Sequence, residues 1–399
     1  MTILCLASYY KGMDFLRFAK REGARVLLLT SLSLKDKADW PEEAIDEIFY
    51  MPDEECIWNR EHAIDAVSFL ARRESIDRLV PLDDFDLELA AGLREHLRIP
   101  GLGESKTRFF RDKLAMRLQA HKSGIRVPEF SPLFNDADVT EFLRDIPGPW
   151  MFKPRSMAGA IGIKKVDHAQ ELWDAAEAVG DLRSHYLIER FVPGDVFHVD
   201  TLSQNGDVLF ELASSYGRPP IDVAQGGGVF TTRILRHGTE LEAELFAMNR
   251  HLLKSFGLTR GASHSEFIRA HQDGQLYFLE TSARVGGANI ADMVFAATGI
   301  NLWGEWARIE LAADEFDYTL PEITNNYAAL LVSLAKDPRP DTSQLNYPEI
   351  VWRMNKLHHV GIVVKSPDYD RVTELLNDLT HRVLNDYNAF MPARTSAAE

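Results

Sequence analysis

The first hundred residues alternate short apolar segments with amphipathic ones, a pattern that few folds accommodate. The apolar segments predict strands at 3–7, 25–29, 47–50 and 78–81, and the amphipathic segments predict helices at 12–21, 60–73 and 84–96. Strands that alternate with helices pair in parallel, so we expect a doubly wound parallel sheet in this region. The first strand-to-helix turn, residues 8–12, lacks the G-x-G-x-x-G pattern, so a Rossmann dinucleotide site is not supported.

Beyond this region the pattern changes to mixed helices and hairpins. Residues 99–103, Ile-Pro-Gly-Leu-Gly, break regular structure, and we place the first domain boundary there. Asn205-Gly206-Asp207 predicts the turn of a hairpin over 198–214. Helices are predicted at 106–122, 168–179 and 370–379, strands at 150–154, 163–166, 186–191, 328–334 and 360–364, and a frayed end at 392–399.

The bulk charge limits the class of partner. The 399 residues carry 44 Lys and Arg against 60 Asp and Glu, a formal net charge of −16. A nucleic-acid-binding surface has to neutralise phosphates, so this balance argues against that class of protein, while a local basic pocket for a small anion is compatible with it. A chain of this length predicts two or three packed units.

The two cysteines, Cys5 and Cys56, are too few for a disulfide framework or a zinc cluster, which favours a reducing compartment. The N-terminal segment lacks the basic start of a signal peptide, and no apolar stretch approaches the roughly 20 residues that span a bilayer. We therefore expect a cytoplasmic protein without a membrane or nucleic-acid partner.

The strongest local motif is Trp-Met-Phe-Lys-Pro-Arg-Ser-Met-Ala-Gly-Ala-Ile-Gly-Ile at 150–163. A strand delivers Lys153, a proline ends the strand, and a loop of small residues follows. Such a loop lets backbone N–H groups approach phosphate oxygens while the lysine supplies a positive charge. It is not a Walker A loop, and an ordinary hairpin with a surface lysine would show the same pattern.

Two glutamates flank a predicted hairpin turn at 271–274. Glu266 and Glu280 each lie inside or at the end of an apolar strand. Two carboxylates brought together by a hairpin need a cation, and Mg²⁺ held by one or two carboxylates and substrate phosphates is the natural one. Salt-bridged or solvent-facing glutamates are the alternative interpretation.

Ser282 and Arg284 follow the second glutamate directly, and the glycines 286 and 287 come next. An arginine beside metal carboxylates suits stabilisation of charge on a transferring phosphoryl group. A helix start opened by flexible glycines is the alternative.

Taken in chain order, these residues resemble the ATP-grasp superfamily over about residues 1–310. The resemblance rests on Lys113, the Lys153 strand with its glycine loop, Glu189 in Leu-Ile-Glu-Arg-Phe-Val-Pro-Gly, Glu266, and Glu280 with Arg284. It implies an α/β pre-ATP-grasp domain with a doubly wound parallel sheet, a two-subdomain ATP-grasp fold and a small C-terminal α+β element. The implied units are 1–104, subdomain A at 105–192 with the lysines and lid, subdomain B at 193–310 with the metal carboxylates, and the C-terminal element at 311–399.

The resemblance also implies roles for particular residues. Lys113 and Lys153 would contact the α- and β-phosphates of ATP, and Arg284 would face the γ-phosphate, with Lys153 and Arg284 as the catalytic pair. The further implied ATP contacts are Ser156, Gly159 and Gly162 in the lid, Glu189, Arg190 and Val192 at the adenine, and Asp195 and His198 as substitutes for a ribose-binding glutamate.

Glu266, Glu280 and Ser282 would hold Mg²⁺, and Mn²⁺ could take its place. The family commonly has Glu-x-Asn-x-Arg at the second carboxylate, and this chain has Ser282 in place of the asparagine. Ser282 still offers an oxygen ligand, and Asn289 could compensate. The departure keeps open a degenerate module that binds nucleotide without turnover.

The implied activity is an ATP-dependent carboxylate–amine ligase that acts through an acyl phosphate on an amino acid or small peptide. A kinase with a stable phosphorylated product is a second alternative. Candidates to hold a substrate carboxylate are Arg155, Arg218, Arg233 and Arg284. The partners are then small carboxylates and amines, and a homodimer is the default assembly.

Three other features carry weaker signals. Asp83, Asp84 and Asp86 follow the fourth strand and are expected chiefly to cap and start a helix. The glycines 226–228 suggest either a mobile loop near substrate or a plain surface connection. His264 is interpreted as substrate-facing or structural.

Overall fold

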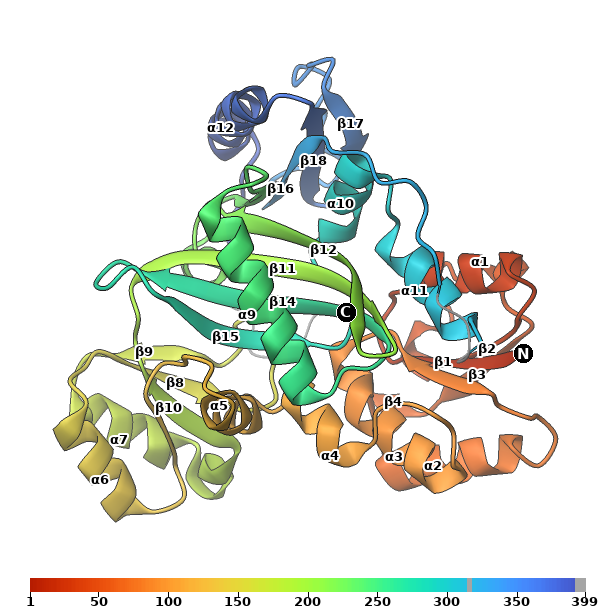
Figure 1. Cartoon of the computed structure of the whole chain (residues 1–399), viewed down its shortest axis with the longest axis horizontal. Coiled ribbons are helices and arrows are strands. Elements are labelled where there is room, and N and C mark those ends of the chain that lie inside the picture. Colours follow the sequence, from red (N-terminus) through yellow and green to blue (C-terminus); the bar gives the residue numbers. More distant parts are fainter. Residues whose placement is uncertain (314–317, 392–399) are drawn as a thin grey trace.

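The computed structural model describes residues 1–313 and 318–391, so the predicted frayed end at 392–399 lies outside the described residues. Three sheets build the molecule, one for each of three regions that follow one another along the chain, with a two-stranded hairpin as the only other paired strands described (Figure 1). No helix in the described part of the chain is long and apolar enough to cross a membrane.

The N-terminal region is the predicted parallel sheet, with strand order β3-β2-β1-β6. Alternate residues of β1 pack into two cores, Ile3 and Cys5 on one face and Leu4 and Leu6 on the other, which explains the uninterrupted apolar run. The elements are β1 (Thr2–Ala7), α1 (Met13–Arg21), β2 (Arg25–Ser31), β3 (Glu47–Met51), β4 (Asp53–Glu54), β5 (Ile57–Trp58), α2 (Arg60–Leu70), β6 (Arg78–Pro81) and α3 (Leu87–Leu97), with 3-10 turns at Leu32–Leu34, Glu42–Ala44 and Asp84–Asp86.

The single helix predicted at 106–122 is wrong. The chain forms α4 (Glu104–Thr107), a 3-10 turn (Arg108–Phe110) and then α5 (Lys113–Lys122). Asp112 causes the break, because it leaves the helical conformation and its carboxylate accepts the N–H groups of Leu114 and Ala115 as the cap of α5. The break places Lys113 in the first turn of a new helix.

A four-stranded antiparallel sheet follows, with the order β7-β10-β8-β9. Helices α6 and α7 pack on it and form the lobe at the lower left of Figure 1. The elements are β7 (Phe130–Pro132), α6 (Asp136–Asp145), β8 (Trp150–Pro154), β9 (Lys164–Val166), α7 (Ala169–Ala178), a 3-10 segment (Gly180–His185) and β10 (Tyr186–Arg190).

An eight-stranded antiparallel sheet, ordered β15-β14-β11-β12-β13-β16-β18-β17, forms the centre of the molecule. The predicted hairpin at Asn205 joins its strands β11 and β12. Its elements are β11 (Gly194–Gln204), β12 (Asp207–Tyr216), α8 (Pro220–Gly226), β13 (Phe230–Ile234), α9 (Glu240–Phe256), β14 (Gly261–Ala270), β15 (Leu276–Ser282), α10 (Ile290–Thr298), α11 (Leu302–Leu311), β16 (Tyr327–Leu334), β17 (Ile350–Arg353), β18 (His359–Ser366) and α12 (Tyr369–Asp386).

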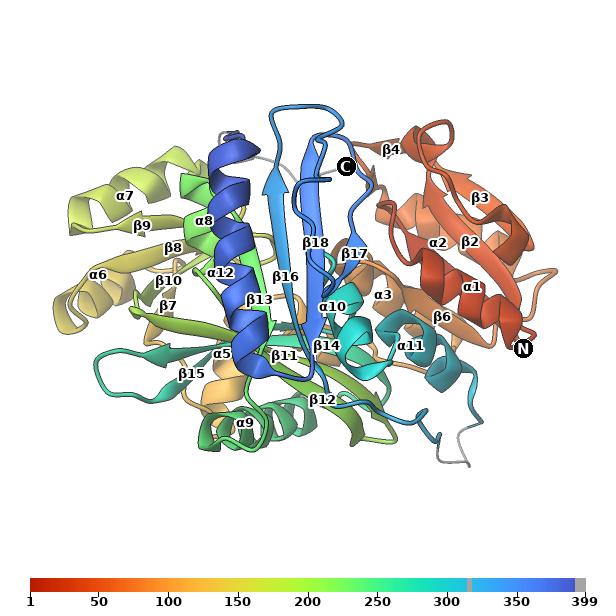
Figure 2. The same ribbon diagram turned by 90° about the horizontal axis from the view of Figure 1, so that it is seen from above.

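The strands after residue 311 extend this large sheet, because β16 pairs with β13 and β18 pairs with β16. Helix α12 lies along the added strands and is longer than the predicted 370–379 (Figure 2). Helix α11 turns back to pack beside α1, so it joins the N-terminal sheet to the large sheet.

Candidate functional site

A cavity of about 390 Å³ lies between the four-stranded and the eight-stranded sheets. One wall comes from α5, β8 and β10, and the other comes from β11, β14 and β15. Charged side chains from both walls converge on it: Lys113, Lys153, Glu189, Arg190, Glu266, Glu280 and Arg284.

On the first wall, Glu189 is buried between two cations. Arg117 donates from Nε to Glu189 Oε2 at 2.9 Å, and Lys153 donates to Oε1. Burial alone would raise the pKa of Glu189, but the positive charges of Arg117 and Lys153 outweigh burial and lower that pKa. For Lys153, burial is the largest influence and lowers the pKa. Glu189 therefore holds Lys153 in place at the floor of the cavity.

Lys113 reaches across to the second wall. Its Nζ lies 2.9 Å from Glu280 Oε2 and donates to the carbonyl of Met157 at 2.6 Å. Its backbone N–H donates to the carbonyl of Arg155, which ties the start of α5 to the end of β8. The two lysines predicted to meet phosphates thus border the same cavity.

Glu266 and Glu280 are opposite each other in the register of β14 and β15. Both line the cavity, beside a register shift after Glu266. The hairpin therefore brings together the two carboxylates that the sequence analysis paired, with Lys113 as a cationic neighbour.

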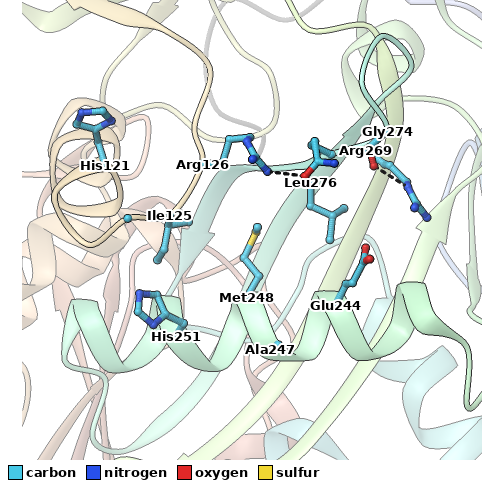
Figure 3. A pocket seen from close by; sticks show the side chains of 12 residues that line it. His121, Ile125, Arg126, Glu244, Ala247, Met248, His251, Arg269, Gly274 and Leu276 are labelled. Atoms are coloured by element: carbon cyan, nitrogen blue, oxygen red, sulfur yellow. Dashed lines mark hydrogen bonds between the residues drawn. The ribbon is translucent and has the colours of Figure 1, made fainter.

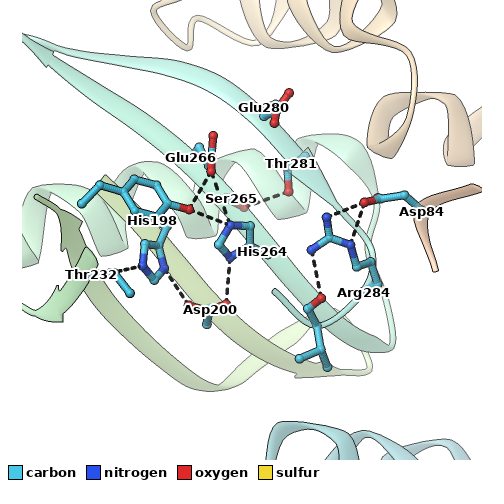
Figure 4. Close-up of polar contacts among 12 residues, drawn as sticks. Asp84, His198, Asp200, Thr232, His264, Ser265, Glu266, Glu280, Thr281 and Arg284 are labelled. Atoms are coloured by element: carbon cyan, nitrogen blue, oxygen red, sulfur yellow. Dashed lines mark hydrogen bonds and ion pairs between the residues drawn. The ribbon is translucent and has the colours of Figure 1, made fainter. Parts of the chain in front are cut away.

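Ser282 and Arg284 both contact Asp84 of the N-terminal region. Figure 4 shows the contact between Arg284 and Asp84. The Ser282 hydroxyl donates to Asp84 Oδ1, and Arg284 Nε donates to Oδ2 at 2.8 Å. Burial would raise the pKa of Asp84, but Arg284 and Arg111 outweigh burial and hold that pKa well below its usual range. The Ser282 hydroxyl donates its proton to Asp84, and its role as a metal ligand stays a prediction. The side-chain N–H of Asn289, the residue expected to compensate, donates to Asp292 Oδ2 at 2.9 Å.

The acidic residues after β6 divide their roles. Asp83 caps the 3-10 turn by accepting the N–H of Phe85 at 3.1 Å, as expected. Asp84 instead orients Arg284, a contact that sequence reasoning missed because the partners are 200 residues apart. Asp86 accepts the N–H of Ser8 at 3.0 Å.

The glycine loop after Lys153 covers the cavity. Gly159 and Gly162 have φ of 67° and 71°, a conformation that glycine adopts freely. Gly159 lines this cavity, while Gly162 lines the neighbouring one described below. Ser156 belongs to the loop but lines neither.

The ribose expectation for Asp195 and His198 is corrected. Side chains of a strand alternate between its faces, and Val196 is the residue of β11 that faces the cavity beside them. Asp195 lies on the other face, mostly exposed, with His271 Nε2 3.4 Å from its carboxylate. His198 shares the face of Val196 but is fully buried, with its ring 4.7 Å from that of Tyr216. Arg190 and Val192 of the predicted adenine segment do line the cavity.

Of the four arginines considered for a substrate carboxylate, only Arg284 lines a cavity of this site. Arg155 pairs with Asp112. Arg233 stacks on Tyr369 under α12, with its guanidinium carbon 4.5 Å from the ring centre. Arg218 is exposed, beside the carbonyl of Gly227.

A second cavity of about 690 Å³ adjoins the first and shares Gly159, Ala160 and Arg284 with it. It lies between the N-terminal region, the glycine loop and the C-terminal strands. Its further lining includes Tyr9, Lys11, Asp83, Phe85, Val223, Gln225, Val332, Leu334, His359 and Met391. Gly227 and Gly228 of the predicted loop line it too, and Asn388 donates to the carbonyl of Gly228 at 3.2 Å.

A third hollow of about 720 Å³ lies between α9 and the start of β15 (Figure 3). Its β14 residue is Arg269, which alternates with Glu266 and Ile268 and so lies on the opposite face of the sheet. Arg269 and Arg126 bond to Gly274 and Gln275 of the hairpin turn. We place the chemistry in the first cavity, where the charged groups of both walls meet.

A buried hydrogen-bonded cluster beneath the first cavity was not anticipated. His198, Asp200 and His264 offer ligand atoms within 4.8 Å of one another, but these atoms already bond to each other (Figure 4). Burial would lower the pKa of His264, but Asp200 outweighs burial and raises it to about 9. The sequence signal was a polar residue at alternate positions of two neighbouring strands, 198 and 200 with 264 and 266.

Comparisons with known proteins find relatives of part of the chain and solved structures with the same fold. No family model matches the chain. The L-arginine-specific L-amino acid ligase of Bacillus subtilis is 27% identical over 245 residues, which is 60% of this chain and 58% of that protein. The match thus spans less than two thirds of that relative.

Solved structures cover nearly the whole chain. The L-amino acid ligase from Bacillus licheniformis superposes with a TM-score of 0.73 at 20% identity, over 94% of this chain and 97% of that one. The biotin carboxylase domain of the Hydrogenobacter thermophilus 2-oxoglutarate carboxylase, a dimer in complex with MgADP, has a TM-score of 0.70 at 16% identity, over 97% and 90%. The chain has the ATP-grasp fold, and the predicted resemblance and fold class are confirmed.

Proposed function

We propose that the chain is an ATP-dependent carboxylate–amine ligase that forms an acyl phosphate and joins an amino acid or small peptide to an amine. One observation supports this most directly: two lysines face two register-paired carboxylates across one cavity, and a second cavity adjoins it. The similarity to L-amino acid ligases supports the choice of substrate class.

The residues fit a divalent ion bound with a nucleotide. Glu266 and Glu280 supply oxygen donors side by side, the ligand type that Mg²⁺ prefers, and Mn²⁺ would be accepted there too. When bound, the ion would neutralise charge on the phosphates. A homodimer, a cytoplasmic location and the four units at 1–104, 105–192, 193–310 and 311–399 belong to the same proposal.

The protein's own groups would act by positioning and by charge. Lys113 and Lys153 bind the α- and β-phosphates, and the glycine loop excludes water from them. Asp84 holds Arg284 towards the γ-phosphate, at the junction of the two cavities. A substrate carboxylate in the second cavity attacks the γ-phosphorus and releases ADP. An amine then attacks the acyl carbon, phosphate leaves, and the nitrogen loses a proton.

The experiment is ADP release with Mg²⁺ across pools of amino acids and small peptides, with product mass measured. We expect ADP only when a carboxylate and an amine are both present, and a condensed product. Glu280→Ala should abolish the reaction, whereas Glu374→Ala, an exposed residue of α12, should not alter it. Nucleotide binding without ADP in any pool would favour the degenerate module, and a stable phosphorylated carboxylate would favour the kinase.

A further inference from the structure

A continuous chain of hydrogen bonds runs through the large sheet and ends on Glu266. Thr232 Oγ1 lies 2.7 Å from His198 Nε2, and His198 Nδ1 lies 2.8 Å from Asp200 Oδ2. The other oxygen of Asp200 lies 2.9 Å from His264 Nδ1. The links from Thr232 to Glu266 cross four neighbouring strands, β13, β12, β11 and β14.

The end of this chain is the metal carboxylate of the proposed site. The hydroxyl of Tyr216 lies 3.3 Å from His264 Nε2 and donates to Glu266 Oε1 at 2.7 Å. His264 Nε2 itself lies 3.6 Å from the same oxygen. Both neighbours thus contact Oε1, which leaves Oε2 as the oxygen that can turn to the cavity.

Strand register assembles the cluster on one face. His198 is opposite Glu266, Asp200 is opposite His264, and Tyr216 is opposite Thr232. The side chains of His198, Asp200 and Thr232 are fully buried. A buried polar group without a partner is costly, so a fully bonded cluster of this kind has one stable arrangement.

Gly286, two residues after Arg284, packs directly against the cluster. A Cβ at Gly286 would lie 2.9 Å from Asp200 Oδ1 and 2.9 Å from His264 Nδ1, closer than real Cβ atoms approach their neighbours. The chain therefore passes directly over the Asp200–His264 hydrogen bond, and the glycine is required for this close approach.

We propose that Tyr216 and His264 are positioning residues that fix Oε1 of Glu266 and so aim its carboxylate at the divalent ion of the nucleotide site. The inference rests on the proposed metal role of Glu266. Partners that orient metal-binding side chains are worth about 10- to 100-fold in metal affinity, so these two residues contribute to ion binding without touching the ion.

The test is the affinity for Mn²⁺ in the presence of ADP, followed by the electron paramagnetic resonance of the free ion. This readout needs no acceptor substrate and no turnover. We expect Tyr216→Phe to weaken Mn²⁺ binding by about 10-fold, with the affinity for metal-free ADP unchanged. The matched control is Tyr347→Phe, which removes a hydroxyl that donates to Asp378 at 2.8 Å on the surface, and it should not alter Mn²⁺ binding.

His264→Gln provides a second variant and should shift Mn²⁺ binding in the same direction. Equal Mn²⁺ affinity in the wild type, Tyr216→Phe and His264→Gln would overturn the proposal. A stoichiometric metal ion that elemental analysis finds in the dialysed wild type but not in dialysed His264→Gln would also overturn it, since His264 would then be a ligand itself. If Tyr216→Phe shifts Mn²⁺ binding while no pool of substrates releases ADP, the positioning role stands and only the ligase proposal fails.

Discussion

Glu189 and Asp86 are both almost completely buried carboxylates near the cavities, yet their surroundings act on them in opposite ways. Glu189 lies between Arg117 and Lys153, and its pKa is lowered despite burial. Asp86 has a backbone N–H as its bonded neighbour, and burial together with the nearby Asp83 raises its pKa to about 7.

The difference shows how this protein retains charge where the site needs it. A buried carboxylate stays ionised only if a counter-ion lies beside it, since desolvation otherwise favours the protonated form. Asp84, two residues before Asp86, has such a counter-ion in Arg284 and keeps its charge. The buried carboxylates that hold the proposed phosphate-binding residues Lys153 and Arg284 are thus the ones with a counter-ion.

Among the substitutions that test this comparison, Glu189→Gln is expected to cause the largest loss of stability. This change leaves the buried Arg117 and Lys153 without their carboxylate, and breaking a buried ion pair on one side costs about 3–5 kcal/mol of unfolding free energy. Urea unfolding of the nucleotide-free protein measures the loss. Glu141→Gln, in the exposed pair with Arg144 on α6, should leave the unfolding midpoint unchanged, and equal midpoints for both variants would contradict the argument.

Asp86→Asn is expected to act in the opposite direction. In the folded protein Asp86 keeps its proton up to about pH 7, whereas the unfolded chain releases it near the ordinary value for aspartate. The folded state therefore binds more protons between these values, so stability falls as the pH rises towards 7. The asparagine variant lacks this loss.

Unfolding at pH 5 and at pH 8 measures this effect. The gain of Asp86→Asn over the wild type should be about 2–3 kcal/mol larger at pH 8, from two pH units at about 1.4 kcal/mol each. Asp174→Asn, an exposed substitution on α7, is the control. Parallel pH profiles for Asp86→Asn and the wild type would show that Asp86 is ionised when folded.

Asp84→Asn tests the buried carboxylate whose counter-ion is Arg284. The amide keeps the shape but removes the charge that orients Arg284, so we expect the turnover number for ADP formation to fall about tenfold. This is less than the 10²- to 10³-fold cost of deleting a charge-stabilising donor outright. The KM for ATP should change little. A larger change in KM than in turnover would place Arg284 in ground-state binding instead.

These cases also show which features could be predicted from the sequence. The strand–helix alternation and the motifs around Lys153, Glu266, Glu280 and Arg284 are each visible in a short stretch of sequence. The alternation and the order of these motifs along the chain both pointed to the ATP-grasp fold. The Asp84–Arg284 contact could not be predicted, because no periodicity links residues that follow strands of two different sheets. The roles assigned to individual site residues stay predictions until the variants are measured.

Local patterns also misled in recognisable ways. The prediction of one helix at 106–122 did not take into account that aspartate favours the N-cap position, and Asp112 is the N-cap of α5. The C-terminal strands were predicted, but their pairing with β13 depends on a partner about a hundred residues earlier. His198 was assigned to ribose from its place in the motif alone. The sequence does not show which residues of neighbouring strands, such as Tyr216, cover its side chain.

The smallest effect is expected at Asp195, a carboxylate that is mostly exposed, in contrast to the buried Glu189 and Asp86. Its carboxylate lies 3.4 Å from His271 Nε2, both side chains are mostly exposed, and surface ion pairs contribute little because water and salt screen them. Asp195→Ala should therefore leave the affinity for ADP within about twofold of the wild type, as measured by calorimetry. Val196→Glu, at the neighbouring position that faces the cavity, should alter that affinity. A tenfold loss with Asp195→Ala would restore Asp195 as a ribose ligand and would require the strand to turn over when nucleotide binds.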